Sequence, residues 1–377
     1  MIASNEALRE HCERWATEPA LGIDTEFLRT RTYYAKPGLI QVSDADGVYL
    51  VDPIAIDDFE PLAKVLGSPS VTKIFHSGEE DLALLARLTG TEVWPIFDTQ
   101  IAAALTGLGF SMSYQAIVNE CFEIALEKGE TRSDWMQRPL TDSQCHYAEQ
   151  DVVWLIPLFD QFNKELDELG RLPWLEAECR LASEAVGRQT SYDITRFRNA
   201  WQLTRRKTAL LAALIVWREA LAQTEDRPRG HILSDEALFA IAAAGACSKV
   251  DLDAVPDKDV RPLKRHRAAI AELETATETL PDDELPDLMP KPFISSSAKG
   301  LVRTLRTLCE ARARELSICP ELLAQRRQLE AFIRSVTNGE ASTFKAWQQS
   351  ALEDIPDAFA RDNADALGIV ARELQHR

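Results

Sequence analysis

The sequence lacks the patterns that would place it in a membrane or in an oxidising compartment. Its seven cysteines are odd in number and scattered, and no two form a Cys-x-x-Cys pair. Neither a disulfide framework nor a cysteine-based zinc site is therefore indicated. The longest apolar run, from Ala209 to Trp217, is too short to cross a bilayer, and Met1 to Glu6 does not have the composition of a signal peptide. We expect a cytoplasmic protein with no membrane contact.

Positive charge is also scarce. The chain has 42 Lys and Arg residues against 60 Asp and Glu residues, which gives a formal net charge of -18. This balance gives no global attraction to nucleic acid, so any nucleic acid must be held by local basic patches and metal ions. With 377 residues, 45% of them hydrophobic, the chain is long enough for two or three packed domains. We expect it to be a monomer.

Two acidic residues interrupt an apolar segment near the N-terminus. The pattern from Leu21 to Phe27 predicts a buried strand, in which Asp24 and Glu26 share one face, about 7 Å apart along the chain. Burying both carboxylates is costly unless a cation neutralises them, and divalent ions such as Mg²⁺ prefer carboxylate oxygens. The alternative is an edge strand with a solvated acidic face.

The next segments predict a mixed α/β domain. Turn residues and alternating hydrophobic residues indicate that the acidic strand begins an antiparallel meander of three strands. The other expected elements are strands at 39–43, 48–53, 71–75 and 96–99, and helices at 6–15, 57–66 and 100–105.

A third carboxylate lies at the start of a further predicted helix, which ends at Leu88. Ser77 and Glu80 have the spacing of a capping box, which places Asp81 at the end of the first helical turn. A strand precedes this turn, and active sites of α/β sheets lie where strands end. Asp81 could equally be an ordinary first-turn acid that the helix dipole favours.

The fourth carboxylate lies on a helix that begins after Thr141. Thr141 and Gln144 form a second predicted capping box, and Tyr147 and Asp151 are four apart, on one helix face. His146 is five before Asp151, so the two are about 140° apart around the axis, against about 40° for Tyr147. Tyr147, and not His146, should therefore face the same site as Asp151. Pro157 is expected to kink the helix after Leu155.

Together these motifs predict a metal site without a serine, cysteine or histidine nucleophile. Asp24, Glu26, Asp81 and Asp151 carry a charge of −4, which matches two divalent cations, Mg²⁺ or Mn²⁺. Two such ions about 4 Å apart stabilise both the attacking and the leaving oxygen of a phosphoryl displacement.

The three motifs, in this order, resemble those of the DEDD exonucleases in the subclass with tyrosine in the third motif, and within that superfamily the bacterial ribonuclease D family. The resemblance extends over nearly the whole chain. The segments that carry it are 24–27, 29–34, 38–41, 80–82, 98–100, 134–135, 138–141 and Tyr147 with Asp151.

This resemblance implies a ribonuclease H-like α/β domain followed by two all-α HRDC-type domains. It implies 3′→5′ removal of single nucleotides as 5′-monophosphates from structured RNAs with a single-stranded 3′ end, tRNA precursors above all. The four carboxylates would hold the metals and Tyr147 would orient the attacking water. Two alternatives stay open, namely a DNA 3′→5′ exonuclease and a catalytically inactive RNA-binding scaffold, which would lack one of the carboxylates.

Candidate RNA contacts are basic and aromatic residues near the motifs and in the first helical domain. Phosphate contacts and base stacking favour these residue types. The alternatives are a solvated loop at 29–34, a core position for Trp135 and a solvated helix face at 205–207. The candidates are Arg29, Arg31, Tyr33, Tyr34, Arg132, Trp135, Arg205, Arg206 and Lys207, and a second basic cluster lies at 261–267.

The change in composition along the chain predicts four parts. Residues 1–192 form the exonuclease domain and 193–279 the first HRDC domain, where Ser234 is an expected N-cap. An acidic, proline-rich linker follows at 280–292, and a second, more divergent HRDC-like domain at 293–377.

Overall fold

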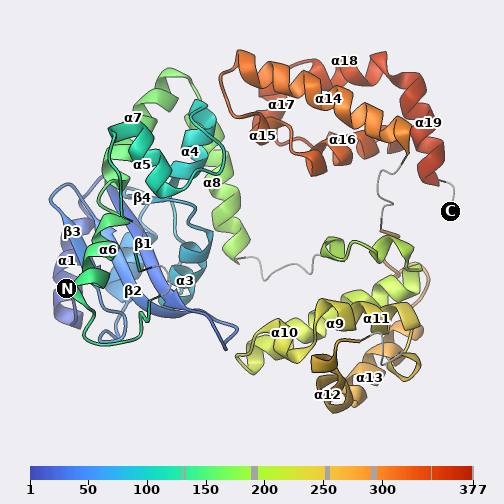
Figure 1. The fold of residues 1–377 in the computed structure, drawn as a ribbon, viewed down its shortest axis with the longest axis horizontal. Helices are drawn as coiled ribbons and strands as arrows, with labels where there is room; N and C mark the ends of the chain where they lie inside the picture. Colours follow the sequence, from blue (N-terminus) through green and yellow to red (C-terminus); the bar gives the residue numbers. More distant parts are fainter. Residues whose placement is uncertain are drawn as a thin grey trace. The chain divides into compact units, whose positions relative to one another are not determined.

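The computed structural model describes residues 1–127, 129–130, 133–187, 194–250, 255–289, 295–340 and 342–375. Contacts divide the chain into two compact units (Figure 1). The first contains Met1–Leu28, Lys36–Gln189 and Phe293–Arg377, and the second contains Arg29–Ala35 and Thr190–Pro292. The segment predicted as the last helical domain thus packs with the exonuclease segment, and the four-part division stays a prediction.

The first unit is built on a five-stranded mixed sheet with the strand order β3-β2-β1-β4-β5. The acidic strand, β1 (Ala20–Leu28), is central. It pairs antiparallel with β2 (Lys36–Ser43), which pairs antiparallel with β3 (Val48–Val51). On its other side it pairs parallel with β4 (Thr72–Phe75), which pairs parallel with β5 (Ile96–Asp98). The predicted mixed sheet with three antiparallel strands at the start is confirmed.

The two edges of β1 pair with their neighbouring strands over different lengths. Its pairing with β2 extends to Leu28, whereas its pairing with β4 stops at Gly22. The half of β1 that carries Asp24 and Glu26 therefore extends beyond β4, and its edge is left for side chains from the elements that follow.

Helices surround the sheet, and two of them, α5 and α8, were not predicted. The N-cap of α5 is Ser113, whose hydroxyl accepts a hydrogen bond from the amide of Ala116. The helices of this part of the unit are α1 (Asn5–Trp15), α2 (Glu60–Leu66), α3 (Glu79–Thr89), α4 (Thr99–Thr106), α5 (Tyr114–Phe122), α6 (Asp142–Gln150), α7 (Leu155–Glu168) and α8 (Leu172–Gly187).

The capping box predicted at Ser77 and Glu80 is wrong. Gly78 is the N-cap of α3 and makes no side-chain cap, and Ser77 has a positive φ of 58°. The carboxylate of Asp98 accepts hydrogen bonds from the backbone amides of Ser77 and Gly78, both at 3.2 Å, and is also the N-cap of α4. A residue from the neighbouring strand thus takes the place of the local cap.

The kink predicted at Pro157 is also wrong. Helix α6 ends at Gln150, and a new helix, α7, begins at Leu155, so Pro157 lies in a first turn. Proline is tolerated there because first-turn amides have no partner within the helix. The capping box at Thr141 and Gln144 is confirmed.

The C-terminal helices share the hydrophobic core of the first unit. Arg171 donates hydrogen bonds to the carbonyls of Leu105 (2.7 Å) and Leu316, and the amide of Cys319 donates one to the carbonyl of Ala104 (3.0 Å). The rings of Trp174 and Trp347 stack with their centroids 5.3 Å apart. These helices are α14 (Ser296–Glu315), α15 (Pro320–Leu323), α16 (Arg326–Asn338), α17 (Ala346–Leu352), α18 (Ile355–Asp362) and α19 (Ala364–Gln375).

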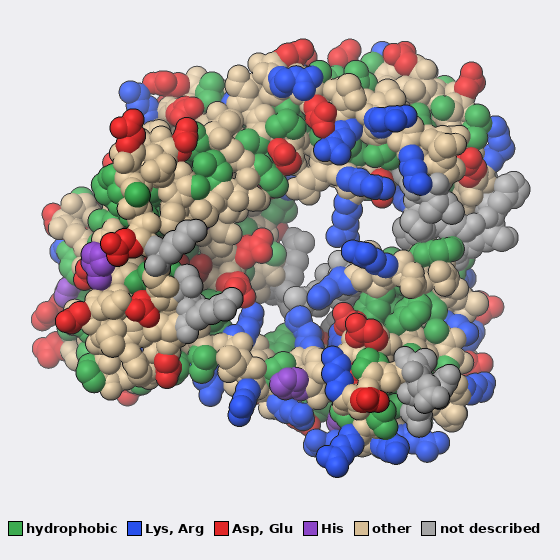
Figure 2. Space-filling view, in the orientation of Figure 1, with side chains coloured by type: hydrophobic (Ala, Val, Ile, Leu, Met, Phe, Trp, Pro, Cys, Tyr) green, Lys and Arg blue, Asp and Glu red, His purple; other side chains and the backbone are tan. Residues whose placement is uncertain are grey.

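The second unit is helical and packs around its own core, which includes Leu211, Leu214 and Leu238. Ser234 is the N-cap of α11, as predicted. Lys and Arg side chains gather on its surface over α12 (Figure 2), where Arg261, among others, is exposed. Its helices are α9 (Arg205–Thr224), α10 (Arg229–Ile232), α11 (Asp235–Ala244), α12 (Asp257–Arg265) and α13 (Arg267–Glu278), with 3-10 turns at Ile194–Arg196, Ala200–Gln202 and Cys247–Lys249.

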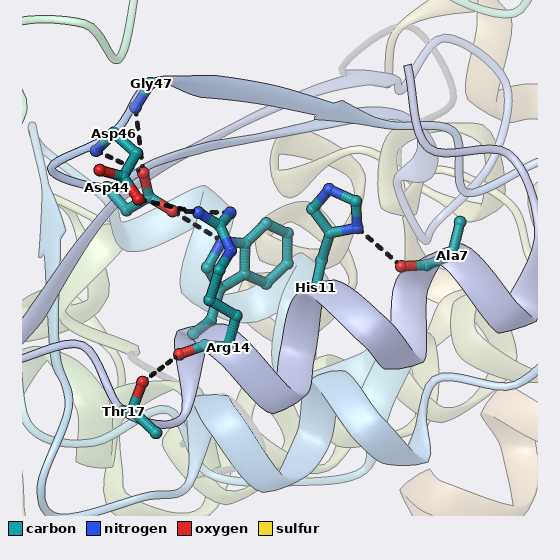
Figure 3. Close-up of polar contacts among 8 residues, drawn as sticks. Ala7, His11, Arg14, Thr17, Asp44, Asp46 and Gly47 are labelled. Carbon is teal, nitrogen blue, oxygen red and sulfur yellow. Dashed lines mark hydrogen bonds and ion pairs between the residues drawn. The ribbon is translucent and has the colours of Figure 1, made fainter.

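Helix α1 is bonded to the turn between β2 and β3 (Figure 3). Arg14 forms an ion pair with Asp44 (2.9 Å), and the same carboxylate accepts a hydrogen bond from the indole of Trp15 (3.1 Å). Asp44 also accepts hydrogen bonds from the amides of Asp46 and Gly47, at 2.9 and 3.0 Å. These contacts fix the turn that sets the pairing of β2 with β3. No helix among the described residues has the length and apolar character needed to span a membrane.

Candidate active site

Three of the four predicted carboxylates meet in the structure. Asp24, Glu26 and Asp151 each place a carboxylate oxygen within 4.8 Å of the others. The first two lie on the same face of β1, because strand side chains alternate. Asp151 is the C-cap of α6, so the end of this helix brings it over the sheet.

Asp81 lies beside this group rather than within it. It is in the first turn of α3, as predicted, and its carboxylate accepts a hydrogen bond from the hydroxyl of Thr25 on β1. Its charge contributes to raising the pKa of Asp24, so the two carboxylates are close enough to interact. The position of Asp81 follows from the short β4, which leaves this edge of β1 open.

The electrostatics of the cluster favour a bound cation. Burial, together with the charges of its carboxylate neighbours, raises the pKa of Asp24 well above its ordinary value. Burial is also the main cause that raises the pKa of Glu26 to about 8, of Asp151 to about 7 and of Asp81 to about 6. Ionising such a cluster is costly without compensating positive charge. An all-oxygen donor set of this charge fits hard divalent ions such as Mg²⁺ or Mn²⁺.

Tyr147 joins this cluster and His146 does not. The side chain of Tyr147 is hydrogen-bonded to the carboxylate of Asp151. Burial and the negative charges of Asp151 and Glu26 raise the pKa of Tyr147, so its hydroxyl keeps its proton at neutral pH. His146, the adjacent residue on α6, is exposed.

Two further side chains support the segment that carries Asp151. The hydroxyl of Tyr114 accepts a hydrogen bond from the amide of Trp154 (3.1 Å), in the turn between α6 and α7. Arg138 donates to both carboxylate oxygens of Asp52, at 2.6 and 2.7 Å, and to the carbonyl of Trp135 (3.0 Å), which fixes the loop before α6. Sequence reasoning missed Tyr114 because α5 was not predicted; Ser113, a cap residue, was the available signal.

Gln41 is another residue that sequence reasoning did not single out for the site. It lies directly opposite Asp24 in the antiparallel pairing of β1 and β2, so both side chains are on one face of the sheet. Gln41 is 0% exposed, and neither end of its amide has a hydrogen-bond partner among the described residues.

The predicted RNA contacts in the loop after β1 have different surroundings. Arg29 and Arg31 are exposed. The hydroxyl of Tyr33 donates a hydrogen bond to the carboxylate of Glu219, and the amides of Tyr33 and Tyr34 both donate to Asp226 at 3.0 Å. Within the second unit, Tyr33 therefore connects this loop to the helices.

Trp135 and the cluster at 205–207 also make contacts within the protein. Trp135 is buried, and its ring lies 6.2 Å from that of Tyr147. Arg205 donates to the carbonyl of Pro286 (3.2 Å), and Arg206 to the carbonyls of residues 277, 278 and 280 at 2.6 to 3.1 Å. Lys207 is bonded to the carbonyl of Ala243. Arg132 lies outside the described residues, and an RNA-binding role for all of these stays a prediction.

Comparison with known proteins finds two matching family models and several relatives that cover most of the chain. A 3'-5' exonuclease family model matches residues 1–167, and an HRDC domain model matches residues 207–273. Ribonuclease D of Pseudomonas paraeruginosa is 36% identical over 339 residues, which cover 89% of each chain. That of Escherichia coli is 36% identical over 344 residues, covering 88% of this chain and 89% of the other. The crystal structure of Escherichia coli ribonuclease D, described as an exoribonuclease involved in structured RNA processing, superposes with a TM-score of 0.84 at 32% identity, covering 96% and 98% of the two chains.

The mixed sheet, the acidic cluster on its central strand and the matching family models define a 3′→5′ exonuclease with an HRDC domain. More narrowly, the chain belongs to the ribonuclease D family of 3′→5′ exoribonucleases. The family inferred from the motifs is confirmed, while the tyrosine subclass stays a prediction.

Proposed function

We propose that this protein removes single nucleotides from the 3′ ends of structured RNAs, tRNA precursors above all, and releases them as 5′-monophosphates. The observation that carries the proposal is the meeting of Asp24, Glu26 and Asp151 within 4.8 Å, on the segment that the exonuclease model matches. Asp81 would complete the set of four carboxylates, which would hold two divalent cations, Mg²⁺ or Mn²⁺.

The carboxylates and Tyr147 have separate roles in the proposed hydrolysis. Bound divalent cations would lower the pKa of the attacking water and neutralise charge on the leaving oxygen. The carboxylates would hold those ions in place. Tyr147 keeps its proton and donates it in a hydrogen bond to Asp151, so a lone pair of its hydroxyl is left to accept a hydrogen bond from the attacking water and orient it.

The RNA backbone would be held by cations outside the acidic cluster. Arg205, Arg206 and Lys207 already donate to backbone carbonyls, whereas the cations on and after α12 are exposed on the second unit (Figure 2). Phosphates attract such patches even on a protein of negative net charge. Arg29 and Arg31, in the loop after the acidic strand, are the proposed contacts nearest the motif in sequence. The exposed cations on α12 and at the start of α13 are Lys258, Arg261, Lys264, Arg265 and Arg267.

The test uses a 5′-labelled RNA hairpin with a single-stranded 3′ tail, incubated with Mg²⁺, with Mn²⁺ or with a chelator. We expect a metal-dependent ladder that shortens from the 3′ end and stops near the stem, and 5′-monophosphates as the released product. Asp151→Asn should abolish the ladder, since one metal-binding carboxylate is lost, while the far-ultraviolet circular dichroism spectrum stays unchanged.

Two results would decide against this function. A DNA hairpin of the same sequence, degraded faster than the RNA, would favour the DNA exonuclease. No ladder with either metal, together with retained RNA binding, would favour the non-catalytic scaffold.

A further inference from the structure

The face of the sheet that carries the acidic cluster contains a buried polar side chain, Gln41, that the proposed chemistry does not use. Asp24 and Glu26 lie opposite Gln41 and Leu39 in the pairing of β1 with β2. Because directly opposite residues of an antiparallel pair share a face, the side chain of Gln41 stands beside that of Asp24, with their Cβ atoms about 5 Å apart.

The surroundings of Gln41 exclude solvent. On the same strand face, Leu39 packs in a cluster with Trp135 and Ala148, and Ser43 donates a hydrogen bond to the carbonyl of Val152 (2.9 Å). Gln41 is therefore enclosed between the sheet and the segment that carries Tyr147 and Asp151. Its side chain is 0% exposed.

The amide of Gln41 has no partner in the described protein, at either its nitrogen or its oxygen. An unbonded buried amide destabilises the fold, so such groups are rare unless a ligand or an ordered water uses them. Leu50, which lies opposite Gln41 on the neighbouring strand β3, has no polar side-chain atom. Asp24 is thus the polar side chain directly beside it in the sheet.

Two other buried glutamines show what a structural role looks like in this chain. Gln144 is part of the capping box of α6, and its amide nitrogen donates to the carbonyl of Asp134 at 3.1 Å. Gln348 on α17 donates to the carbonyl of Leu322 at 2.6 Å. Both amides are used within the protein, whereas that of Gln41 is not.

We propose that Gln41 is a positioning residue of the metal site: when a divalent cation is bound, its amide nitrogen, which has no partner in the described metal-free protein, donates a hydrogen bond to the carboxylate of Asp24 and orients that carboxylate toward the cation. The inference rests on the proposed metal site. Groups that orient metal ligands in this way typically contribute about 10- to 100-fold to metal affinity.

The test compares Gln41→Met with the wild type by isothermal titration calorimetry with Mn²⁺ and by thermal denaturation in chelator. Methionine keeps the length and removes the polar atoms. We expect the Kd for Mn²⁺ to rise about 10- to 100-fold. The Tm of the metal-free protein should stay unchanged or rise, because a buried amide without a partner has been removed. The control, Gln348→Met, should lower the Tm and leave the Kd for Mn²⁺ unchanged.

Gln41→Leu serves as a second variant without a donor, and it should also bind Mn²⁺ more weakly. A Kd within twofold of the wild type in Gln41→Met or in Gln41→Leu, or a Tm loss as large as that of Gln348→Met, would each overturn the assignment. Absence of Mn²⁺ binding by the wild type would overturn the proposed metal site itself, which separates the two failures.

Discussion

The side chain of Tyr147 is hydrogen-bonded to the carboxylate of Asp151, four residues further along at the end of α6. Residues four apart lie on one helix face, so the helix itself brings them together. His146, one residue earlier than Tyr147, is exposed. The two neighbours therefore offer a direct comparison between a residue in the acidic cluster and one outside it.

Tyr147→Phe should lower kcat on single-stranded RNA about 100-fold, as loss of one orienting hydrogen bond in an active site typically does. KM should change little, because the ring and its packing against Trp135 are kept. His146→Phe is the matched control on the same helix turn and should leave kcat within twofold. A larger loss in the histidine variant would mean that the helix presents the other residue to the substrate.

The raised carboxylate pKa values predict how the stability of the metal-free protein depends on pH. In the folded chain Glu26, Asp151 and Asp81 titrate at about 8, 7 and 6, above their ordinary values of 4.5 and 3.8. The folded state thus keeps protons that the unfolded state has lost. These groups should therefore reduce the stability as the pH rises from about 4 to about 8, with no further loss above that range.

This dependence is measured by thermal denaturation in chelator and in saturating Mg²⁺. Because a cation takes the place of the protons, the difference in Tm between the two conditions should widen as the pH rises from about 5 to about 8. In Asp151→Asn the Tm of the metal-free protein should depend less on pH, because one of the mutually repelling carboxylates has been removed. A metal-free Tm that rises over this range in the wild type, with the same slope in Asp151→Asn, would contradict the prediction.

Two segments with the sequence pattern of a capping box show how much can be predicted from local sequence. Thr141 and Gln144 form the predicted box, because both partners lie within one turn. Ser77 and Glu80 have the same spacing but form none, because the carboxylate of Asp98, from the next strand, accepts from the amides before α3. The local pattern is the same, and a contact between distant residues decides the outcome.

The same distinction applies to the candidate site. The spacing of Asp24 with Glu26 and of Tyr147 with Asp151 is local, so the sequence alone predicted which side chains share a face. The place of Gln41 beside Asp24 depends on the register of β1 with β2, which no spacing within one segment reveals.

Asp98→Ala tests whether this residue fixes the helix that carries Asp81. The carboxylate accepts from the amides of Ser77, Gly78, Gln100 and Ile101, at 2.8 to 3.3 Å. Its removal should lower the free energy of unfolding of the first unit by about 2 kcal/mol, the upper range for loss of an N-cap. The Kd for Mn²⁺ should rise as well, because the start of α3 is no longer fixed.

The control for this change is Glu79→Ala, which removes an exposed acid in the first turn of α3. It should change the free energy of unfolding by no more than about 0.5 kcal/mol. Equal effects of the two substitutions on urea denaturation would show that Asp98 acts through its charge alone and not through its four hydrogen bonds.

Two possible roles of Tyr33, attachment of the loop after β1 and contact with RNA, can be tested separately by removing its hydroxyl oxygen. Its hydroxyl is bonded to Glu219 and lies 3.2 Å from the amide of Gln223 and 3.3 Å from the guanidinium of Arg229. Tyr33→Phe keeps a ring that can stack on a base and removes only these bonds.

If Tyr33 serves to attach the loop after β1 to the helices of the second unit, the backbone amides of Tyr33 and Tyr34 in Tyr33→Phe should exchange hydrogen about fivefold faster, since loss of one hydrogen bond costs about 1 kcal/mol. Arg31→Ala, in the same loop, should leave this exchange unchanged and weaken RNA binding instead. Unchanged exchange in Tyr33→Phe, with weaker RNA binding, would return Tyr33 to the RNA-contact role that the sequence predicted.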